Sequence, residues 1–171
     1  MRVKTREIAI AGVLSALTLV LGMTPLGNIP VPTLASAVTI MHLPVILAGI
    51  LAGPALGAVV GLIFGLLTMI RFWPYDPRVL IPARVLIGPL SFLVWSRLRH
   101  TRWGLPLAAV AGSAVNTVGT LGLAVVFGWI PFAGTAGALG IAAIHGTPEA
   151  IVSGLVVTPI VLAVNRAMHR S

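Results

Sequence analysis

The sequence contains no cysteine and only three acidic residues. Without cysteine the chain has no disulfide, no thiolate metal site and no thiol nucleophile. Charged residues make up 8% of the 171 residues, whereas hydrophobic residues make up 58%. A soluble domain of this length needs far more polar surface, so the composition predicts an integral membrane protein. The net charge of +8 is then an orientation signal in the membrane, and nucleic acid is not an expected partner.

Six apolar segments follow one another along the chain, and each predicts a helix. We expect an all-α integral membrane protein with six transmembrane helices in one membrane domain, 1–171. The first segment follows basic residues, as in a signal peptide, but it lacks a clear cleavage site, so we expect a retained helix. The predicted helices cover residues 6–24, 39–52, 55–72, 79–97, 105–129 and 141–167.

The second predicted helix is short. Its roughly 14 residues span ~21 Å at the helical rise, against ~30 Å of hydrocarbon in a bilayer. It must therefore be tilted, extended by the loop before it, or sheltered by its neighbours. That loop, 25–38, contains three prolines, which argue against a continued helix.

Six spans place both termini on one side of the membrane, and the basic residues indicate which side. Eight Lys and Arg residues share the side of the termini, whereas three, offset by Asp76, share the other. The positive-inside rule therefore predicts that both termini are cytoplasmic. The eight are Arg2, Lys4, Arg6, Arg97, Arg99, Arg102, Arg166 and Arg170, and the three are Arg71, Arg78 and Arg84.

A few polar residues lie inside the apolar segments, notably Arg84, Asn116 and Glu149. A charge in hydrocarbon costs several kcal/mol, so an intramembrane ionisable group predicts a functional site. In the six-span topology these groups fall in the outer half of the bundle. That asymmetry predicts a pocket open to the outside and closed from the inside, because a channel needs a polar lining throughout. The predicted binding residues are Arg84, Asn116, Glu149, His145, His42 and Trp73.

Each of the three central residues has two interpretations. Arg84 either clamps a ligand carboxylate through its planar fork or forms a structural ion pair with Glu149. Glu149 either contacts a ligand or benefits from the macrodipole of the last helix, since Pro148 before it is typical of a first helical turn. Asn116 either binds a ligand or holds helices together.

The histidines and aromatic residues are less specific signals. His42 and His145 lack metalloenzyme spacing, so hydrogen-bonded histidines are expected and no metal or cofactor is predicted. Trp73 is either a binding residue or one of the aromatic residues that mark a membrane interface.

Small residues form a second pattern, because they let helices approach closely. In the first segment Ala11 pairs with Ser15 and Gly12 with Ala16, each four residues apart. These pairs predict a helix face that contacts either the bundle or a partner protein. A glycine ladder in the next two segments predicts internal packing. It consists of Gly49, Gly53, Gly57, Gly61 and Gly65.

The sequence has no GxSxG motif, no P-loop and no paired-carboxylate motif. A chain this small, with an outward pocket and no energy-converting site, can bind a solute but cannot by itself drive its uptake.

Four stretches of sequence resemble the substrate-binding S components of energy-coupling factor (ECF) vitamin transporters. They cover four of the six segments in order, and the basic start and small-residue first helix match as well. His145 stands where an asparagine is expected before the Gly-x-Pro-Glu turn. The stretches are TIMHLPVILAGILAGPALGAVVGLIFGL (39–66), ARVLIGPL (83–90), GSAVNTVGTLG (112–122) and HGTPEAIVSGLVVTPIV (145–161).

The resemblance implies a prokaryotic cell-membrane protein with six helices and a vitamin pocket near the outer face, capped by the loop between the first two helices. It implies that Ala11, Gly12, Ser15 or Ala16 contacts a transmembrane T component. It further implies two partner ATPases that supply the energy, while the S component topples in the membrane to deliver its ligand. The pattern is most similar to the pantothenate-type branch, with folate and cobalamin relatives near it.

Two other function classes remain open on the sequence alone. One is a small membrane enzyme that uses Glu149 and the histidines as an acid/base or metal site. The other is a purely structural subunit of a membrane assembly.

Overall fold

The computed structural model describes residues 4–30, 37–71 and 76–169, and these residues are almost entirely helical. Its helices are α1 (Thr5–Met23), α2 (Leu43–Ala52), α3 (Pro54–Arg71), α4 (Pro77–Leu98), α5 (Gly104–Val126), α6 (Ala138–Ile141) and α7 (Thr147–His169), with a π turn, η2 (Ala142–Gly146), between α6 and α7. Four helical runs in the described residues are long and apolar enough to cross a membrane, and α2 and α3 are shorter apolar helices. The predicted helical membrane class is therefore confirmed.

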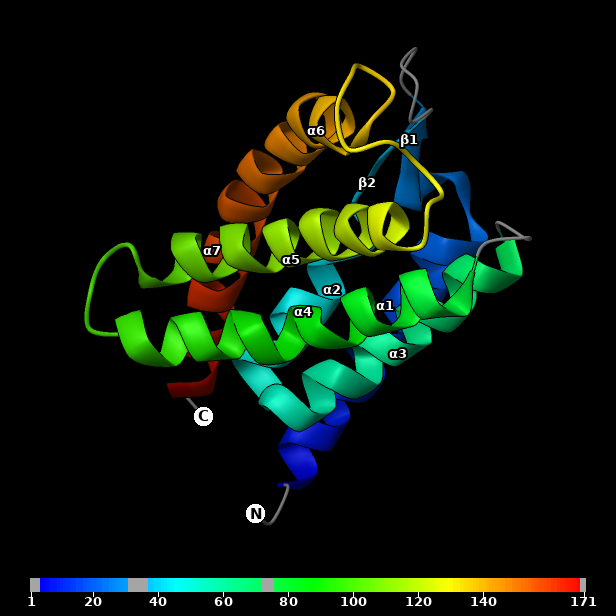
Figure 1. Ribbon diagram of the computed structural model, residues 1–171. Helices are drawn as coiled ribbons and strands as arrows, with labels where there is room; N and C mark the ends of the chain where they lie inside the picture. The colour runs from blue at the N-terminus through cyan, green and yellow to red at the C-terminus, as the bar shows by residue number, and fades with distance from the viewer. Residues whose placement is uncertain (1–3, 31–36, 72–75, 170–171) are drawn as a thin grey trace.

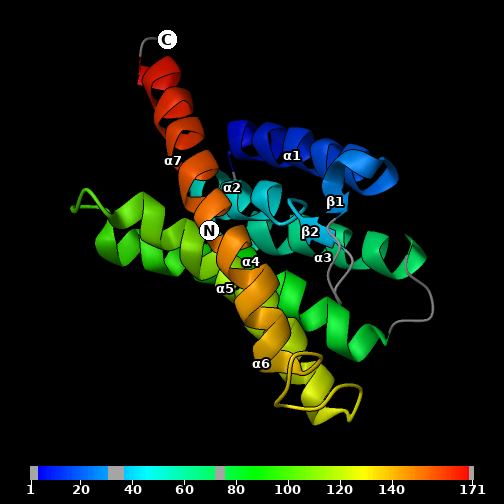
Figure 2. The same ribbon diagram turned by 90° about the horizontal axis from the view of Figure 1, so that it is seen from above.

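The two ends of the chain lie at the same end of the bundle. In Figure 1 the start of α1, the end of α7 and the turn between α4 and α5 lie toward the lower left. The connection between α5 and α6 lies toward the upper right, with the short strands β1 (Asn28–Pro30) and β2 (Ala37–Thr39). Figure 2 shows α7 crossing α5 and α4 at a steep angle.

The short helix α2 forms the centre of the molecule. Nine of its ten residues are buried, and it contacts α1, α3, α4, α5 and α7. It begins at Leu43 and not at residue 39, because Ala37–Thr39 pair as a strand. Of the three ways to accommodate a short second helix, the structure uses shelter by neighbouring helices.

Glycines bring α2, α3 and α4 into backbone contact beneath this centre. A Cβ atom on Gly57 would lie 2.7 Å from the Cα of Gly49 and 3.0 Å from the Cα of Gly88. Further along α3, a Cβ on Gly61 would collide with the backbone carbonyl of Arg84. Gly49, Gly57 and Gly61 therefore pack inside the bundle and fix the backbone that carries Arg84. Gly53 of the predicted ladder does not pack there: a Cβ on it would meet nothing within 4 Å, and it ends α2 with a φ of 94°.

The described parts of the segment predicted as a loop, 25–30 and 37–38, contain regular backbone structure. A 3₁₀ turn (Pro25–Gly27) leads into β1, which pairs with β2 in antiparallel register, with Asn28 opposite Thr39. The Ile40 N–H donates to the Gly27 carbonyl at 3.1 Å and closes the base of this hairpin. Its tip, 31–36, lies outside the described residues.

The last helical run begins earlier than predicted, and this corrects the expectation about Glu149. Helix already starts at Ala138, and a π turn ends just before Thr147. Pro148 has no N–H to donate to the Ile144 carbonyl, so it interrupts the α-helical ladder where the wider turn is found. Glu149 thus lies within a continuous helical run and not at a free helix N-terminus.

Candidate functional site

Five of the six predicted binding residues lie in the described part of the chain, and all five are buried. They come from the start of α2, from α4, α5 and α7, and from the π turn η2. Trp73 lies outside the described residues. The five are His42, Arg84, Asn116, His145 and Glu149, each between 1% and 7% exposed.

Glu149 ties three elements together. Its Oε1 accepts a hydrogen bond of 2.8 Å from the backbone N–H of Thr39 at the end of β2. The side chain of Thr117 on α5 hydrogen-bonds to the same carboxylate. The acid on α7 therefore holds the base of the hairpin against α5.

Arg84 crosses from α4 to α5. Its Nη1 donates to the Thr120 hydroxyl at 2.5 Å, and that hydroxyl donates to the backbone carbonyl of Asn116 at 2.6 Å. Its guanidinium carbon lies 5.1 Å from the centroid of the Phe64 ring on α3, within the range of a cation–π contact. One α5 hydroxyl and one aromatic face thus hold the buried charge.

Arg84 and Glu149 do not pair directly. The one salt bridge among the described residues joins Asp76 and Arg78, at 2.8 Å. Arg84 and Glu149 are still close enough to interact through their charges. The structural ion pair that the sequence left open is therefore not formed, and a hydroxyl of α5 holds each charge instead: Thr120 holds the cation and Thr117 the anion.

Several buried polar atoms near these charges have no hydrogen-bond partner within the described ranges. They include Nε of Arg84, Oδ1 of Asn116 and Oγ of Ser113. A buried donor or acceptor left unpaired costs about 1–3 kcal/mol. One of these atoms is a donor and the others can accept a hydrogen bond. A ligand with matching groups could pair with them, so this region is a candidate binding site.

The two histidines differ in their surroundings. His42 Nε2 lies 2.8 Å from Oγ of Ser153, and that hydroxyl donates to the Glu149 carbonyl at 2.7 Å. His145 is buried in the π turn, where the adjacent Gly146 packs against Thr117. No cluster of three metal-binding side chains is present among the residues that the structure describes.

Sequence reasoning missed four residues of this network: Thr39, Thr117, Thr120 and Ser153. A usable signal existed for two of them. Thr120 follows Asn116 by four positions and Ser153 follows Glu149 by four, so each hydroxyl lies one turn further along the same helix face. Thr39 acts through its backbone N–H, which no side-chain pattern reveals.

A comparison with protein families decides the assignment. The family model described as "ECF transporter, substrate-specific component" matches residues 6–163. The chain belongs to this family. The match includes every described polar residue of the site and confirms the resemblance found in the sequence. A comparison with curated proteins found no match.

Family membership sets the coarse function. The chain is a substrate-specific subunit of an ECF transporter, which is a transport subunit. Such a subunit has a small-molecule substrate and associates with a T component and ATPases. Its apolar helices suit a multi-pass protein of the plasma membrane.

On α1 of this S component, the two small-residue pairs face different ways. Ala11 is buried in the apolar core and Ser15 is half-buried, whereas Gly12 and Ala16 are exposed. A Cβ atom on Gly12 would meet nothing within 4 Å. Of the two predicted pairs, Gly12/Ala16 is therefore the one that lies on the surface of the bundle.

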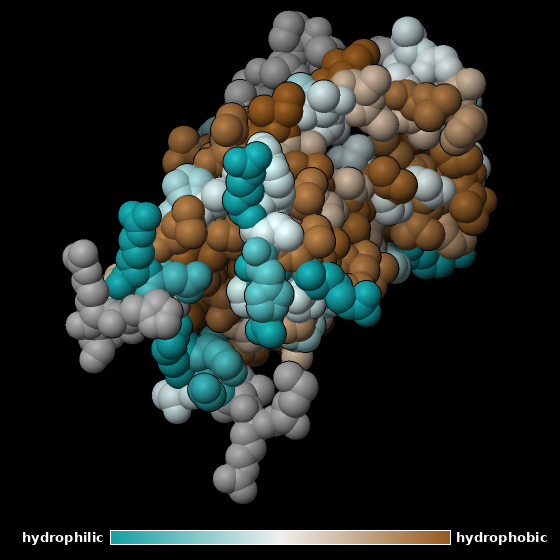
Figure 3. Space-filling model, turned by 90° about the vertical axis from the view of Figure 1, so that its left-hand side faces the viewer, coloured by the Kyte–Doolittle hydropathy of each residue, from teal (hydrophilic) through white to brown (hydrophobic). Residues whose placement is uncertain are grey.

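The two ends of the S component differ in charge. Figure 3 shows hydrophilic side chains on the face at the left of Figure 1, among apolar ones. This end of the bundle includes exposed basic residues of α1, of α7 and of the α4–α5 turn, in agreement with the basic side predicted from the sequence. They are Lys4, Arg6, Arg97, Arg99, Arg102 and Arg166.

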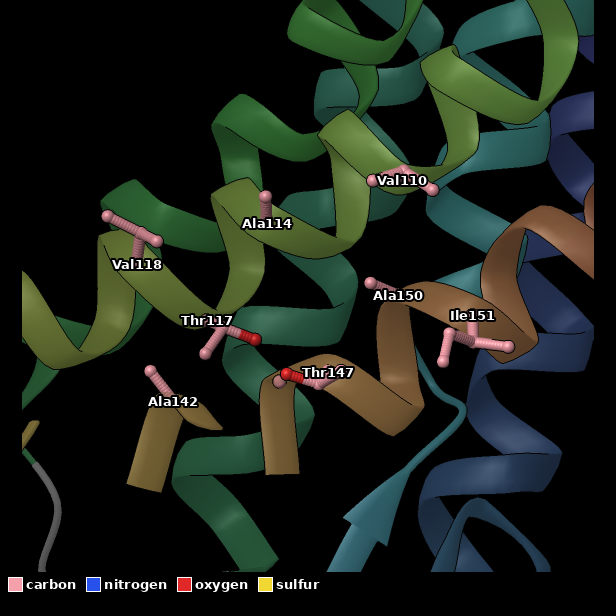
Figure 4. Close-up of a pocket in the computed structure, with 9 residues that line it drawn as sticks. Val110, Ala114, Thr117, Val118, Ala142, Thr147, Ala150 and Ile151 are labelled. Carbon is pink, nitrogen blue, oxygen red and sulfur yellow. The ribbon is translucent and has the colours of Figure 1, made fainter. Parts of the chain in front are cut away.

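An apolar groove of about 340 Å³ lies beside the polar residues. Figure 4 shows its lining, with Val110, Ala114 and Val118 from α5 on one side and Ala150 and Ile151 from α7 on the other. Thr117, the partner of Glu149, also lines the groove. The groove therefore adjoins the polar site but presents almost no polar atoms of its own.

Proposed function

We propose that this S component captures a small anionic micronutrient, a vitamin or a related compound, and that Arg84 and Asn116 contact it. The observation that supports this most strongly is the pair of open positions, Nε of Arg84 and Oδ1 of Asn116. A bound molecule that accepts from the first and donates to the second relieves the cost of burying both. The planar guanidinium suits a carboxylate on the ligand.

Pantothenate is the specific candidate. It carries one carboxylate for Arg84, and its hydroxyl and amide groups can donate to Asn116. The sequence around TIMH (39–42), Asn116 and Pro148-Glu149 also resembles the pantothenate-type branch of the family. Glu149 and His42 surround the ligand in this proposal, and Glu149 holds the hairpin over it through Thr39.

The proposed orientation has both termini in the cytoplasm of a prokaryotic cell. Two observations support it: the exposed basic residues at the end where the chain begins and finishes, and the position of the hairpin at the other end. The site then faces outward in a six-span bundle, with α2 sheltered at its centre.

Energy for uptake comes from partners in this proposal. The Gly12/Ala16 face of α1 contacts the T component, because its small residues allow close helix approach. Two ATPase subunits supply the energy, and the S component topples to release its ligand inward.

The proposal is tested by identifying the small molecules retained by the purified full-length protein with mass spectrometry. We expect pantothenate or another monoanionic micronutrient from the unmodified protein, and its loss from Arg84→Ala and Asn116→Ala. The control is Thr158→Val, which removes a hydroxyl of α7 that bonds only one turn back, to Gly154. Retention of the same molecule in both site variants, with folding intact, contradicts the site assignment.

A further inference from the structure

We propose that the site selects its ligand by charge: it takes molecules with one negative charge that also carry O–H or N–H donors, and Glu149 excludes molecules with two. This inference rests on the proposed function and deepens it. It assigns Glu149 to specificity and not to direct pairing with the ligand.

The first step of the argument is the separation of the two buried charges. A direct contact between Arg84 and Glu149 would offset part of the cost of burying both. The structure instead holds Arg84 on Thr120 and Glu149 on Thr117 and Thr39, with no salt bridge between them. The guanidinium is therefore left with an open Nε–H that no acid in the described residues occupies.

The second step concerns which ligand groups fit the open positions. Nε–H of Arg84 requires an acceptor, and a negatively charged one gives the stronger bond. Oδ1 of Asn116 requires a donor, and Oγ of Ser113, one turn before it on α5, takes either. One anionic group and at least one O–H or N–H group satisfy these atoms together.

The third step concerns Glu149. Its carboxylate already accepts from the Thr39 backbone and from Thr117, so it needs no group of the ligand. It is 6% exposed, and water screens its charge only weakly there. A second anionic group on the ligand would meet this negative charge, which no salt bridge in the described residues neutralises, and such like-charge repulsion is a common source of specificity.

The test measures dissociation constants for a series of vitamins with the purified full-length protein. Pantothenate and biotin are singly charged anions with donors, lipoate is a singly charged anion without them, folate is doubly charged and pyridoxine is neutral. We expect tight binding only among the singly charged anions with donors, and at least about tenfold weaker binding of the others.

The variant Glu149→Gln keeps the shape and removes the charge. We expect it to improve the affinity for folate relative to the tightest monoanion by about tenfold. Glu7→Gln, the same change at the start of α1, is the matched control and leaves the ratio unchanged. A merely structural role of Glu149 would weaken all ligands alike, so an unchanged ratio overturns the proposal.

The series separates this inference from the proposed function. The proposed selection of singly charged anions with donors is called the charge rule below. If biotin binds and pantothenate does not, the pantothenate assignment is wrong and the charge rule is supported. If folate or pyridoxine binds the unmodified protein more tightly than every monoanion, the charge rule falls while the transport role stands. If Glu149→Gln does not fold, the ranking of ligands on the unmodified protein still decides. If none of the ligands binds, both the charge rule and the anionic substrate are wrong.

Discussion

Two buried interfaces meet at Arg84, and they are built on opposite principles. Toward α3 and α2, the backbone of α4 packs directly against glycines, with Gly88 beside Gly49 and Gly57. Toward α5 and α7, the side chain enters a network of hydroxyls, an amide and a carboxylate with unpaired atoms. In the first interface the backbones are in direct contact and have no room to move closer. In the second, donor and acceptor atoms are still without hydrogen bonds. The comparison indicates that the glycine contact is a rigid base, and in the proposed function the polar network is the part that responds to ligand.

The largest expected effect comes from breaking the rigid base. In Gly88→Leu the new side chain would collide with the backbone of Gly57, so α3 and α4 must separate. We expect a loss of about 3 kcal/mol or failure to fold, measured by thermal unfolding in detergent.

The control for this variant is Gly122→Leu, because a Cβ on Gly122 meets nothing within 4 Å. It should keep the stability of the unmodified protein. Equal stability of the two leucine variants would show that the glycine contact is not the base that we describe.

A smaller effect is expected inside the polar network. Thr120→Val removes the hydroxyl that holds Nη1 of Arg84 and leaves the glycine contact intact. We expect about a tenfold loss of ligand affinity, because Arg84 is no longer held in place, and a loss of stability of about 1.5 kcal/mol, since one hydrogen bond to a charged group is worth about 1.5–3 kcal/mol. Titration calorimetry with the retained ligand measures the affinity, and thermal unfolding measures the stability.

Thr158→Val serves as the matched control, because Thr158 makes the same kind of backbone bond on α7. If both valine variants lose affinity equally, Thr120 has no special part in positioning Arg84.

The smallest effect is expected at an ion pair outside both interfaces. Asp76 caps α4 and pairs with Arg78, which holds the pKa of Asp76 below its ordinary value. Its contribution to stability is therefore present above the ordinary Asp pKa of 3.8 and is lost as the pH falls through the lower value in the folded protein.

Asp76→Asn should lower the unfolding temperature at neutral pH by less than any variant above, and the difference from the unmodified protein should vanish in acid. Thermal unfolding of both proteins at a series of pH values measures this difference in unfolding temperature. A loss as large as that of Gly88→Leu would remove the distinction between buried interfaces and surface pairs.

Much of this arrangement was predictable from the sequence. Hydropathy predicted the helices, and a glycine at every fourth position from 49 to 65 predicted close internal packing. That packing is found at Gly49, Gly57 and Gly61 but not at Gly53. The cost of burying a charge in hydrocarbon singled out Arg84 and Glu149 as candidate site residues from their positions in apolar segments alone. These signals work because they depend on side-chain chemistry at fixed helical spacing.

Other features had no such signal. The hairpin depends on backbone pairing between Asn28 and Thr39, and proline-rich sequence does not reveal it. The π turn before Pro148 results from one missing N–H within a longer helical run. The separation of Arg84 from Glu149 depends on Thr117 and Thr120, whose common role is visible only once α5 is in place.

The most direct test of the central claim is an experimental structure of the protein with its ligand bound. The account predicts an anionic oxygen of the ligand within hydrogen-bond distance of Arg84 Nε and a ligand donor at Asn116 Oδ1. A ligand seated instead in the apolar groove between Val110 and Ile151, with Arg84 still bonded only to Thr120, would contradict it.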